Sequence, residues 1–149
     1  MRAVVQRVDR ARVWVGDERV AEMERGLLAL VGVAHDDRAS DASELAQKLV
    51  GLRVFEDGAG RMNRSLLELG LTLGVVSQFT VMADCRKGRR PSFGEAAAPE
   101  IAAPLIDRLV EAARELGVRV VTGRFQATMS VEIVNHGPVT LLLDTRKVF

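Results

Sequence analysis

An apolar run from Leu27 to Ala34, interrupted only by Gly32, most narrowly limits what this chain can fold into. A strand with one solvent-exposed face alternates polar and apolar residues. A run without that alternation is typical of a strand buried on both faces. The segment from Leu71 to Val76 is also largely apolar and predicts a second strand. We therefore expect a sheet with an interior strand covered above and below.

Further strands are predicted toward both ends of the chain. Val4 to Val15 is rich in β-branched residues and leads through Gly16-Asp17 into Glu18 to Ala21, which favours a hairpin. Three short strands are expected near the C-terminus, over residues 119–121, 130–134 and 139–143, and Asn135-His136-Gly137-Pro138 is predicted to be a turn between the last two.

Two segments have the spacing of amphipathic helices. Leu45, Leu49 and Leu52 predict a helix over residues 41–53, with Asp41 and Glu44 spaced almost as in a capping box. A second helix presents Leu105, Leu109, Ala112 and Leu116 on one face and ends at Gly117, so Pro104 must lie in its first turn or kink it. The order of elements implies an α/β fold in which two helices pack on a mixed sheet. A second β layer is also compatible with this order.

Composition narrows the class of protein. The chain has 149 residues, a formal charge of +1 and one cysteine, Cys85. We expect one domain over residues 1–149 in a reducing, cytoplasmic compartment. No apolar stretch approaches the roughly 18 residues of a membrane span, so no membrane partner is expected. The balanced charge gives no general attraction to nucleic acid, and DNA is not an expected partner.

Metal and cofactor chemistry find no support in the residue spacing. The two histidines, His35 and His136, and the single cysteine form no recognised ligand pattern. Gly58-Ala59-Gly60 lacks the third glycine of a dinucleotide-binding turn. We therefore expect no metal and no cofactor.

Three segments are candidates for a functional site. Ser77-Gln78-Phe79-Thr80 follows a predicted strand, where polar side chains either face a pocket or satisfy backbone groups at the strand end. Gly137-Pro138 is either a plain turn or a backbone segment that can approach a ligand closely. The polar segment 83–94 is expected to be a long surface loop. Within it, Cys85 is a possible nucleophile whose thiol pKa its basic neighbours would lower.

Several motifs in matching order resemble the D-aminoacyl-tRNA deacylase family over nearly the whole chain. They include Val5-Gln6-Arg7-Val8, Arg61-Met62-Asn63, Ser77-Gln78-Phe79-Thr80, Arg90-Pro91-Ser92-Phe93, Thr122-Gly123-Arg124-Phe125 and Asn135-His136-Gly137-Pro138-Val139-Thr140.

The resemblance implies a homodimeric editing hydrolase with a three-layer α/β/β fold of the deacylase type. Such enzymes cleave the ester that joins a D-amino acid, or glycine, to the terminal adenosine of tRNA. The resemblance places Ser77, Gln78, Phe79 and Thr80 in the catalytic pocket. It implies that Gly137 and Pro138, joined by a cis bond, reach into the partner subunit's pocket. Arg7, Phe125 and Met129 are the further substrate-binding residues it implies.

Stereochemistry gives these parts a physical purpose. D and L residues carry the same groups on Cα with hydrogen and side chain exchanged, so attractive contacts alone cannot separate them. A rigid backbone wall that admits hydrogen but no side chain can separate them, and it also admits glycine. We expect the guanidinium of Arg7 to help hold that wall through carbonyl oxygens.

The catalytic step has two readings. Thr80 could attack the ester, although no base is clearly placed to activate it. The resemblance favours catalysis assisted by the 2′-hydroxyl of the tRNA, with backbone N–H groups near Phe79 and Thr80 stabilising the oxyanion. Other functions left open are an esterase with Thr80 or Cys85 as nucleophile and a non-catalytic tRNA-binding module. Basic residues of the 83–94 loop are expected to contact tRNA phosphates: Arg86, Lys87, Arg89 and Arg90.

Two residues depart from the family pattern. His136 stands where many relatives are expected to carry an acidic or amide residue, which would alter the turn or make it sensitive to pH near neutrality. Gln126 stands where the family is expected to carry a smaller residue, and the longer side chain would narrow the adenosine or amino-acid pocket.

Overall fold

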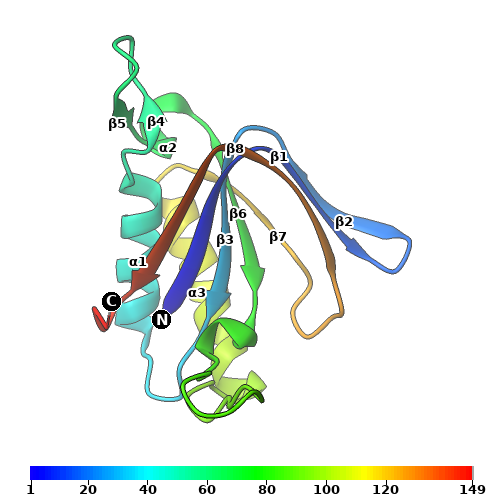
Figure 1. Ribbon diagram of the computed structural model, residues 1–149. Coiled ribbons are helices and arrows are strands. Elements are labelled where there is room, and N and C mark those ends of the chain that lie inside the picture. The colour runs from blue at the N-terminus through cyan, green and yellow to red at the C-terminus, as the bar shows by residue number, and fades with distance from the viewer. Residues whose placement is uncertain (149) are drawn as a thin grey trace.

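A mixed six-stranded sheet forms the centre of the computed structural model, which describes residues 1–148 (Figure 1). Five strands follow the order β2-β1-β3-β6-β7, and β8 pairs with β1. Pairing is antiparallel between β1 and each of β2, β3 and β8, and parallel between β3 and β6 and between β6 and β7. The strands of this sheet are β1 (Arg2–Val15), β2 (Glu18–Met23), β3 (Gly26–Gly32), β6 (Thr72–Ser77), β7 (Arg119–Thr122) and β8 (Ser130–Asp144).

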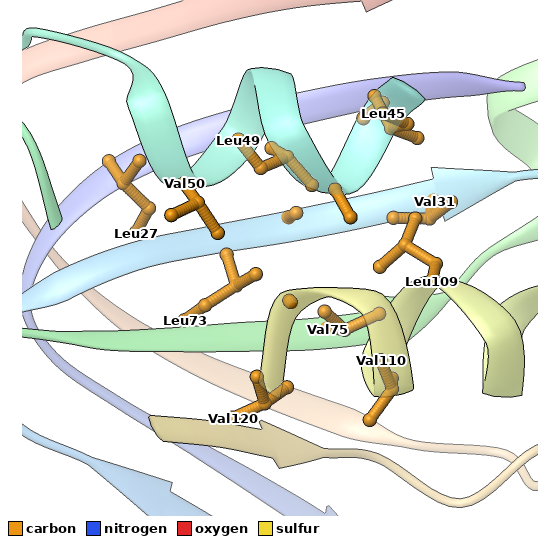
Figure 2. Close-up of a cluster of buried hydrophobic side chains, with 14 of the residues drawn as sticks. Leu27, Val31, Leu45, Leu49, Val50, Leu73, Val75, Leu109, Val110 and Val120 are labelled. Atoms are coloured by element: carbon orange, nitrogen blue, oxygen red, sulfur yellow. The ribbon is translucent and has the colours of Figure 1, made fainter. Parts of the chain in front are cut away.

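Two helices cover one face of this sheet, as predicted. They are α1 (Ala39–Gly51) and α3 (Pro99–Glu115). Figure 2 shows how apolar side chains of β3 and β6 meet those of the two helices in one buried cluster. Leu27 and Leu73 lie in that cluster with Leu49 of α1 and Leu109 of α3, and all four are fully buried.

The opposite face of β3 and β6 is covered by β-structure. The later part of β1 pairs with β2, and these strands enclose a second apolar cluster with Leu28 of β3 and Val76 of β6. Adjacent residues Leu27 and Leu28 therefore belong to different clusters, which explains why apolar residues follow one another along this strand without alternation. The predicted mixed sheet with two packed helices is confirmed, and the layers are α, β and β.

The structure corrects the predicted start of the first helix and removes one of the two alternatives for Pro104. Helix α1 begins at Ala39, and the Asp41 carboxylate accepts a hydrogen bond from the Arg38 backbone N–H at 2.9 Å. Asp41 is thus the third helical residue of the capping arrangement, and the predicted arrangement of Asp41 with Glu44 is wrong. In α3 the first helical position belongs to Pro99, and Pro104 lies inside the helix beyond its first turn.

The elements that connect the layers are too short for a hydrophobic pattern in the sequence to predict them. They are β4 (Phe55–Glu56), β5 (Met62–Arg64), α2 (Leu66–Leu69) and the 3₁₀ helix η1 (Phe79–Met82). No helix within residues 1–148 combines the length and apolar character needed to cross a bilayer.

The predicted turn at residues 135–138 does not divide two strands, so this prediction is wrong. β8 runs from Ser130 to Asp144, and it pairs with β1 on both sides of this segment. Asn135 pairs with Val8, and Thr140 pairs with Gln6, so residues 136–139 lie opposite Arg7 alone. Because β8 pairs with β1 again beyond these extra residues, they form a bulge in β8. We call it the 136–139 bulge.

Candidate functional site

A cavity of about 700 Å³ opens at the carboxyl end of β6. This edge of a parallel sheet is a common place for a ligand site, because the loops that follow the strands diverge there. Ser77, Gln78, Phe79 and Thr80 all line the cavity. The other walls come from the start of α3, the ends of β3 and β6, and the chain between β7 and β8: Val31, Val33, Val76, Ala97, Pro99, Ala102, Ile106, Phe125, Gln126, Ala127, Thr128, Met129 and Val131.

The chain turns sharply where β6 passes into η1. The Gln78 backbone N–H donates to the Val31 carbonyl at 2.8 Å, which ties the turn to β3. The first hydrogen bond within η1 is donated by Val81 to the Gln78 carbonyl at 3.2 Å. The N–H groups of Phe79 and Thr80 precede that bond, so helix geometry assigns them no internal acceptor. Such N–H groups can bind a carbonyl or an oxyanion.

The hydroxyl of Thr80 lies beside an amide. Gln78 Nε2 donates to Thr80 Oγ1 at 2.9 Å, and the Thr80 side chain is exposed. An amide N–H is only a donor, so this contact cannot take the proton that a nucleophilic hydroxyl must lose. Gln78 therefore does not serve as a general base for the Thr80 hydroxyl.

Arg7 braces the 136–139 bulge from inside the fold. Its side chain is only 3% exposed. Arg7 Nε donates to the His136 carbonyl at 3.2 Å, and Nη1 donates to the Val54 carbonyl at 2.6 Å. One guanidinium thus joins the bulge to the segment before β4. The carbonyl it holds in the bulge is that of His136, next to Gly137.

Gly137 and Pro138 are exposed at the tip of this bulge, and the peptide bond between them is cis. Gly137 has a φ of +118°, and a Cβ added there would lie 2.7 Å from Arg7 Nη2. Glycine is therefore favoured at this position both by the backbone conformation and by the close approach of Arg7.

The predicted site residues fall into separate groups. Phe125 and Met129 join the four residues Ser77–Thr80 in the cavity. Arg7, Gly137 and Pro138 are not among the residues that line it within the described part of the chain, 1–148. The bulge therefore forms no part of the wall of this cavity in its own chain.

The four basic residues predicted to contact phosphate are all exposed: Arg86, Lys87, Arg89 and Arg90. Arg86 differs from the others, because its Nε and Nη2 donate to the two carboxylate oxygens of Asp84 at 2.9 and 2.7 Å. These bonds, with a further one from the Arg86 backbone N–H, hold the pKa of the Asp84 carboxyl well below its ordinary range. Asp84 thus offsets the charge of Arg86 at neutral pH.

An aromatic contact at the cavity was not predicted from the sequence. The ring of Phe93, in the 83–94 loop, meets that of Phe79 edge to face with 5.0 Å between centroids. Phe79 remains 59% exposed and Phe93 37% exposed, so aromatic surface stays open to solvent. Both phenylalanines belong to motifs that resemble the family, but only the folded loop shows that their rings touch. Residues of α3 such as Ala102 and Ile106 gave no sequence signal, because small and apolar side chains on a helix usually indicate a core.

Other reactive side chains lie away from this cavity. Cys85 is a free, exposed thiol that does not line it within residues 1–148. His136 Nδ1 lies 3.0 Å from Asp9 Oδ1, and His136 does not line the cavity within residues 1–148. Across residues 1–148, no group of three or more histidine, cysteine, aspartate or glutamate side chains is arranged to hold a metal ion.

Comparisons with known proteins agree over the whole length of the chain. Residues 4–144 match a family model described as D-Tyr-tRNA(Tyr) deacylase. A D-aminoacyl-tRNA deacylase of Symbiobacterium thermophilum is 55% identical over 149 residues, covering 100% of this chain and 99% of its own. That of Clostridioides difficile is 51% identical and covers 100% of both chains.

Solved structures show the same architecture. One described as "c-Myc DNA Unwinding Element Binding Protein" has a TM-score of 0.91 and 36% identity, covering 97% of this chain and 99% of its own. A second, described as a probable eukaryotic D-amino acid tRNA deacylase, has a TM-score of 0.82 and 19% identity, covering 95% and 97%. At that identity the second likeness concerns the fold alone.

Proposed function

This chain belongs to the D-aminoacyl-tRNA deacylase family, and on that premise we propose how its cavity and its 136–139 bulge share the work of hydrolysis. The enzyme is a hydrolase that acts on D-aminoacyl-tRNA. Its products are the free D-amino acid and tRNA. We further propose that it acts in the cytoplasm, and that it accepts glycine wrongly attached to tRNA.

The bulge acts on a second copy of the chain. This proposal is carried by one observation: a buried arginine braces the exposed Gly137-Pro138 segment, yet that segment does not line the cavity of its own chain. Burying a charged side chain until it is only 3% exposed, with hydrogen bonds to two carbonyls, is a costly support for a plain surface turn. We propose a homodimer in which each bulge enters the partner's cavity.

In that position the bulge serves as the stereochemical wall. Its backbone leaves room for the hydrogen on Cα of a D residue and excludes the side chain of an L residue. Glycine carries hydrogen on both sides and passes. Arg7 is a positioning residue here, since it touches the bulge and not the substrate.

The tRNA supplies the reactive hydroxyl. In our proposal the 2′-hydroxyl of the terminal ribose orients a water molecule, whose oxygen attacks the ester carbonyl carbon. The bond from that carbon to the ribose 3′-oxygen then breaks, and the 3′-oxygen takes up the proton released by the water. The backbone N–H groups of Phe79 and Thr80 hold the developing oxyanion. This route suits a Thr80 hydroxyl whose neighbour, Gln78 Nε2, is a donor.

Release of free amino acid from charged tRNA tests the proposal. We expect the D-aminoacyl and glycyl esters to be cleaved and the matching L-aminoacyl ester to survive. A substrate whose terminal ribose lacks the 2′-hydroxyl should be nearly inert. Undiminished cleavage of that 2′-deoxy substrate would indicate that Thr80 or Cys85 is the nucleophile. Binding of charged tRNA without release of amino acid would indicate a non-catalytic tRNA-binding module.

A further inference from the structure

The wall of the cavity contains a turn in which one residue is unfavourable for its position. Ala127 N–H donates to the Arg124 carbonyl at 3.2 Å, which closes a turn with Gln126 as its third residue. Gln126 has a φ of +60°. A turn with a positive φ at the third position favours glycine or asparagine, because a longer side chain crowds the backbone there. Glutamine is an unfavourable residue for this position.

Within the described residues, left-handed backbone is otherwise almost confined to glycines. Within residues 1–148, the non-glycine residues with positive φ are Gln126 and Lys147, whose φ is +54°. Gln126 lines the cavity, whereas Lys147 does not. A residue held in an unfavourable conformation at a ligand site points to a function for its side chain.

The surroundings of Gln126 narrow that function. Residues such as Val33, Val76 and Ile106 make much of the cavity apolar. Gln126 lines the cavity and is exposed, so a ligand can reach this residue from solvent. A carboxamide offers one donor and one acceptor side by side, a pattern that matches the edge of adenine. The amino-acid side chain varies among substrates, so one carboxamide cannot match them all.

We propose that Gln126 is a specificity-determining residue that binds the edge of the terminal adenine of the tRNA. This inference rests on the proposed function, since it takes the aminoacylated end of tRNA as the ligand of the cavity. The exposed ring of Phe79, which lines the same cavity, offers a face on which that base can stack. In this proposal the left-handed turn serves to present the carboxamide to the base.

Gln126→Gly separates the two consequences of this arrangement. Glycine relieves the left-handed backbone, so we expect the melting temperature to rise by about 2–4 °C. The same variant loses the base contact, so we expect KM for D-aminoacyl-tRNA to rise about tenfold with kcat almost unchanged. Lys147→Gly is the matched control, because it relieves the same conformation away from the cavity. It should raise the melting temperature and leave KM unchanged.

A change in the base completes the test. On tRNA whose terminal adenosine is replaced by purine riboside, which lacks the exocyclic amine, the wild-type enzyme should lose about tenfold in kcat/KM. For Gln126→Gly, kcat/KM should be nearly the same on this substrate as on the normal one. Gln126→Glu, which keeps the chain length but not the amide donor, should behave like Gln126→Gly in KM.

Three results would overturn the inference. They are an unchanged KM in Gln126→Gly, equal sensitivity of wild type and variant to the base change, or a KM effect that follows the amino-acid side chain. None of these would affect the proposed function, which fails only if the wild-type enzyme releases no D-amino acid from normal tRNA or does not distinguish D from L.

Discussion

Arg7 is the residue on which the proposed stereochemical wall most depends. Its guanidinium donates to carbonyls of His136 and Val54, which are far apart in sequence. A lysine has one charged nitrogen at its end and lacks the planar fork that reaches both. Arg7→Lys should therefore lower the free energy of unfolding by about 1–3 kcal/mol, the cost of a buried hydrogen bond to a charged group.

The same variant should weaken chiral discrimination. With the His136 carbonyl no longer held, we expect cleavage of L-aminoacyl-tRNA to rise by about tenfold relative to the D substrate. Free amino acid released from the two substrates gives this ratio directly. Arg10→Lys is the control, since Arg10 lies on the same strand and pairs with Glu132 at 3.2 Å on the surface. A D/L ratio that Arg7→Lys leaves unchanged would show that Arg7 supports stability only.

Thr80 provides a second test at the level of one residue. If the 2′-hydroxyl of tRNA drives the reaction, Thr80→Ala removes a cavity group but no nucleophile. We expect kcat to fall by less than about tenfold, well short of the loss that follows removal of a nucleophile. Steady-state hydrolysis of D-aminoacyl-tRNA measures it, with circular dichroism to confirm the fold. Activity reduced to the level of buffer would make Thr80 the nucleophile.

Lys87 and Arg86 should differ in their contribution to tRNA binding, although both are exposed in one loop. The Asp84 carboxylate is ionised at neutral pH and pairs with the Arg86 guanidinium at 2.7 Å, so it offsets the charge of Arg86. The pKa of the Asp84 carboxyl, lowered by these bonds, extends the pairing to more acidic pH. Lys87→Ala should reduce the slope of log affinity against log salt by about 0.7–0.9, the value of one phosphate contact. Arg86→Ala should reduce it less. Equal reductions in titrations with labelled tRNA would contradict this assignment.

At the level of elements, sequence reasoning succeeded where one pattern extends over many residues. The run from Leu27 to Ala34 predicted burial on both faces, and the helical spacing of Leu45 and Leu49 predicted α1. Both patterns result from burial that repeats regularly along the chain. The position of Ser77–Thr80 after a buried strand left two alternatives, a pocket or a plain strand end, and in the structure all four residues line a cavity.

The remaining features depend on contacts between distant segments. A Gly-Pro pair predicts a turn, but β1 pairs with β8 on both sides of it and makes it a bulge. Nothing near Arg7 in the sequence indicates that Val54 and His136 would be its acceptors. The contact of Phe79 with Phe93 likewise depends on how the 83–94 loop folds back. Local preference fixes neither the register of paired strands nor the course of a long loop.

The helical layer should contribute most of its stability through buried leucines. Leu109 is fully buried between α3 and the sheet. Leu109→Ala should lower the free energy of unfolding by about 2–5 kcal/mol, because it leaves a cavity that the sheet cannot fill. Ile101→Ala, on the same helix at 43% exposure, should cost far less. Urea denaturation compares the two, and equal losses would mean that α3 packs differently.

At the scale of the whole molecule, each half of the proposed active site comes from a different copy. The cavity at the end of β6 supplies the pocket and the N–H groups, and the 136–139 bulge of the partner supplies the wall. Subunits carrying different defects can therefore be combined. Arg7→Lys weakens the wall and keeps the cavity. Ala102→Trp fills the cavity from α3 and keeps the wall.

Mixing these two variants tests the shared site most directly. Alone, Arg7→Lys should cleave both D- and L-aminoacyl-tRNA, and Ala102→Trp should cleave neither. With excess Ala102→Trp, each Arg7→Lys subunit receives an intact wall from its partner, so cleavage of the L substrate should fall while cleavage of the D substrate continues. Cleavage of the L substrate that stays constant, with subunit exchange verified by co-purification of differently tagged chains, would contradict a wall that acts between copies.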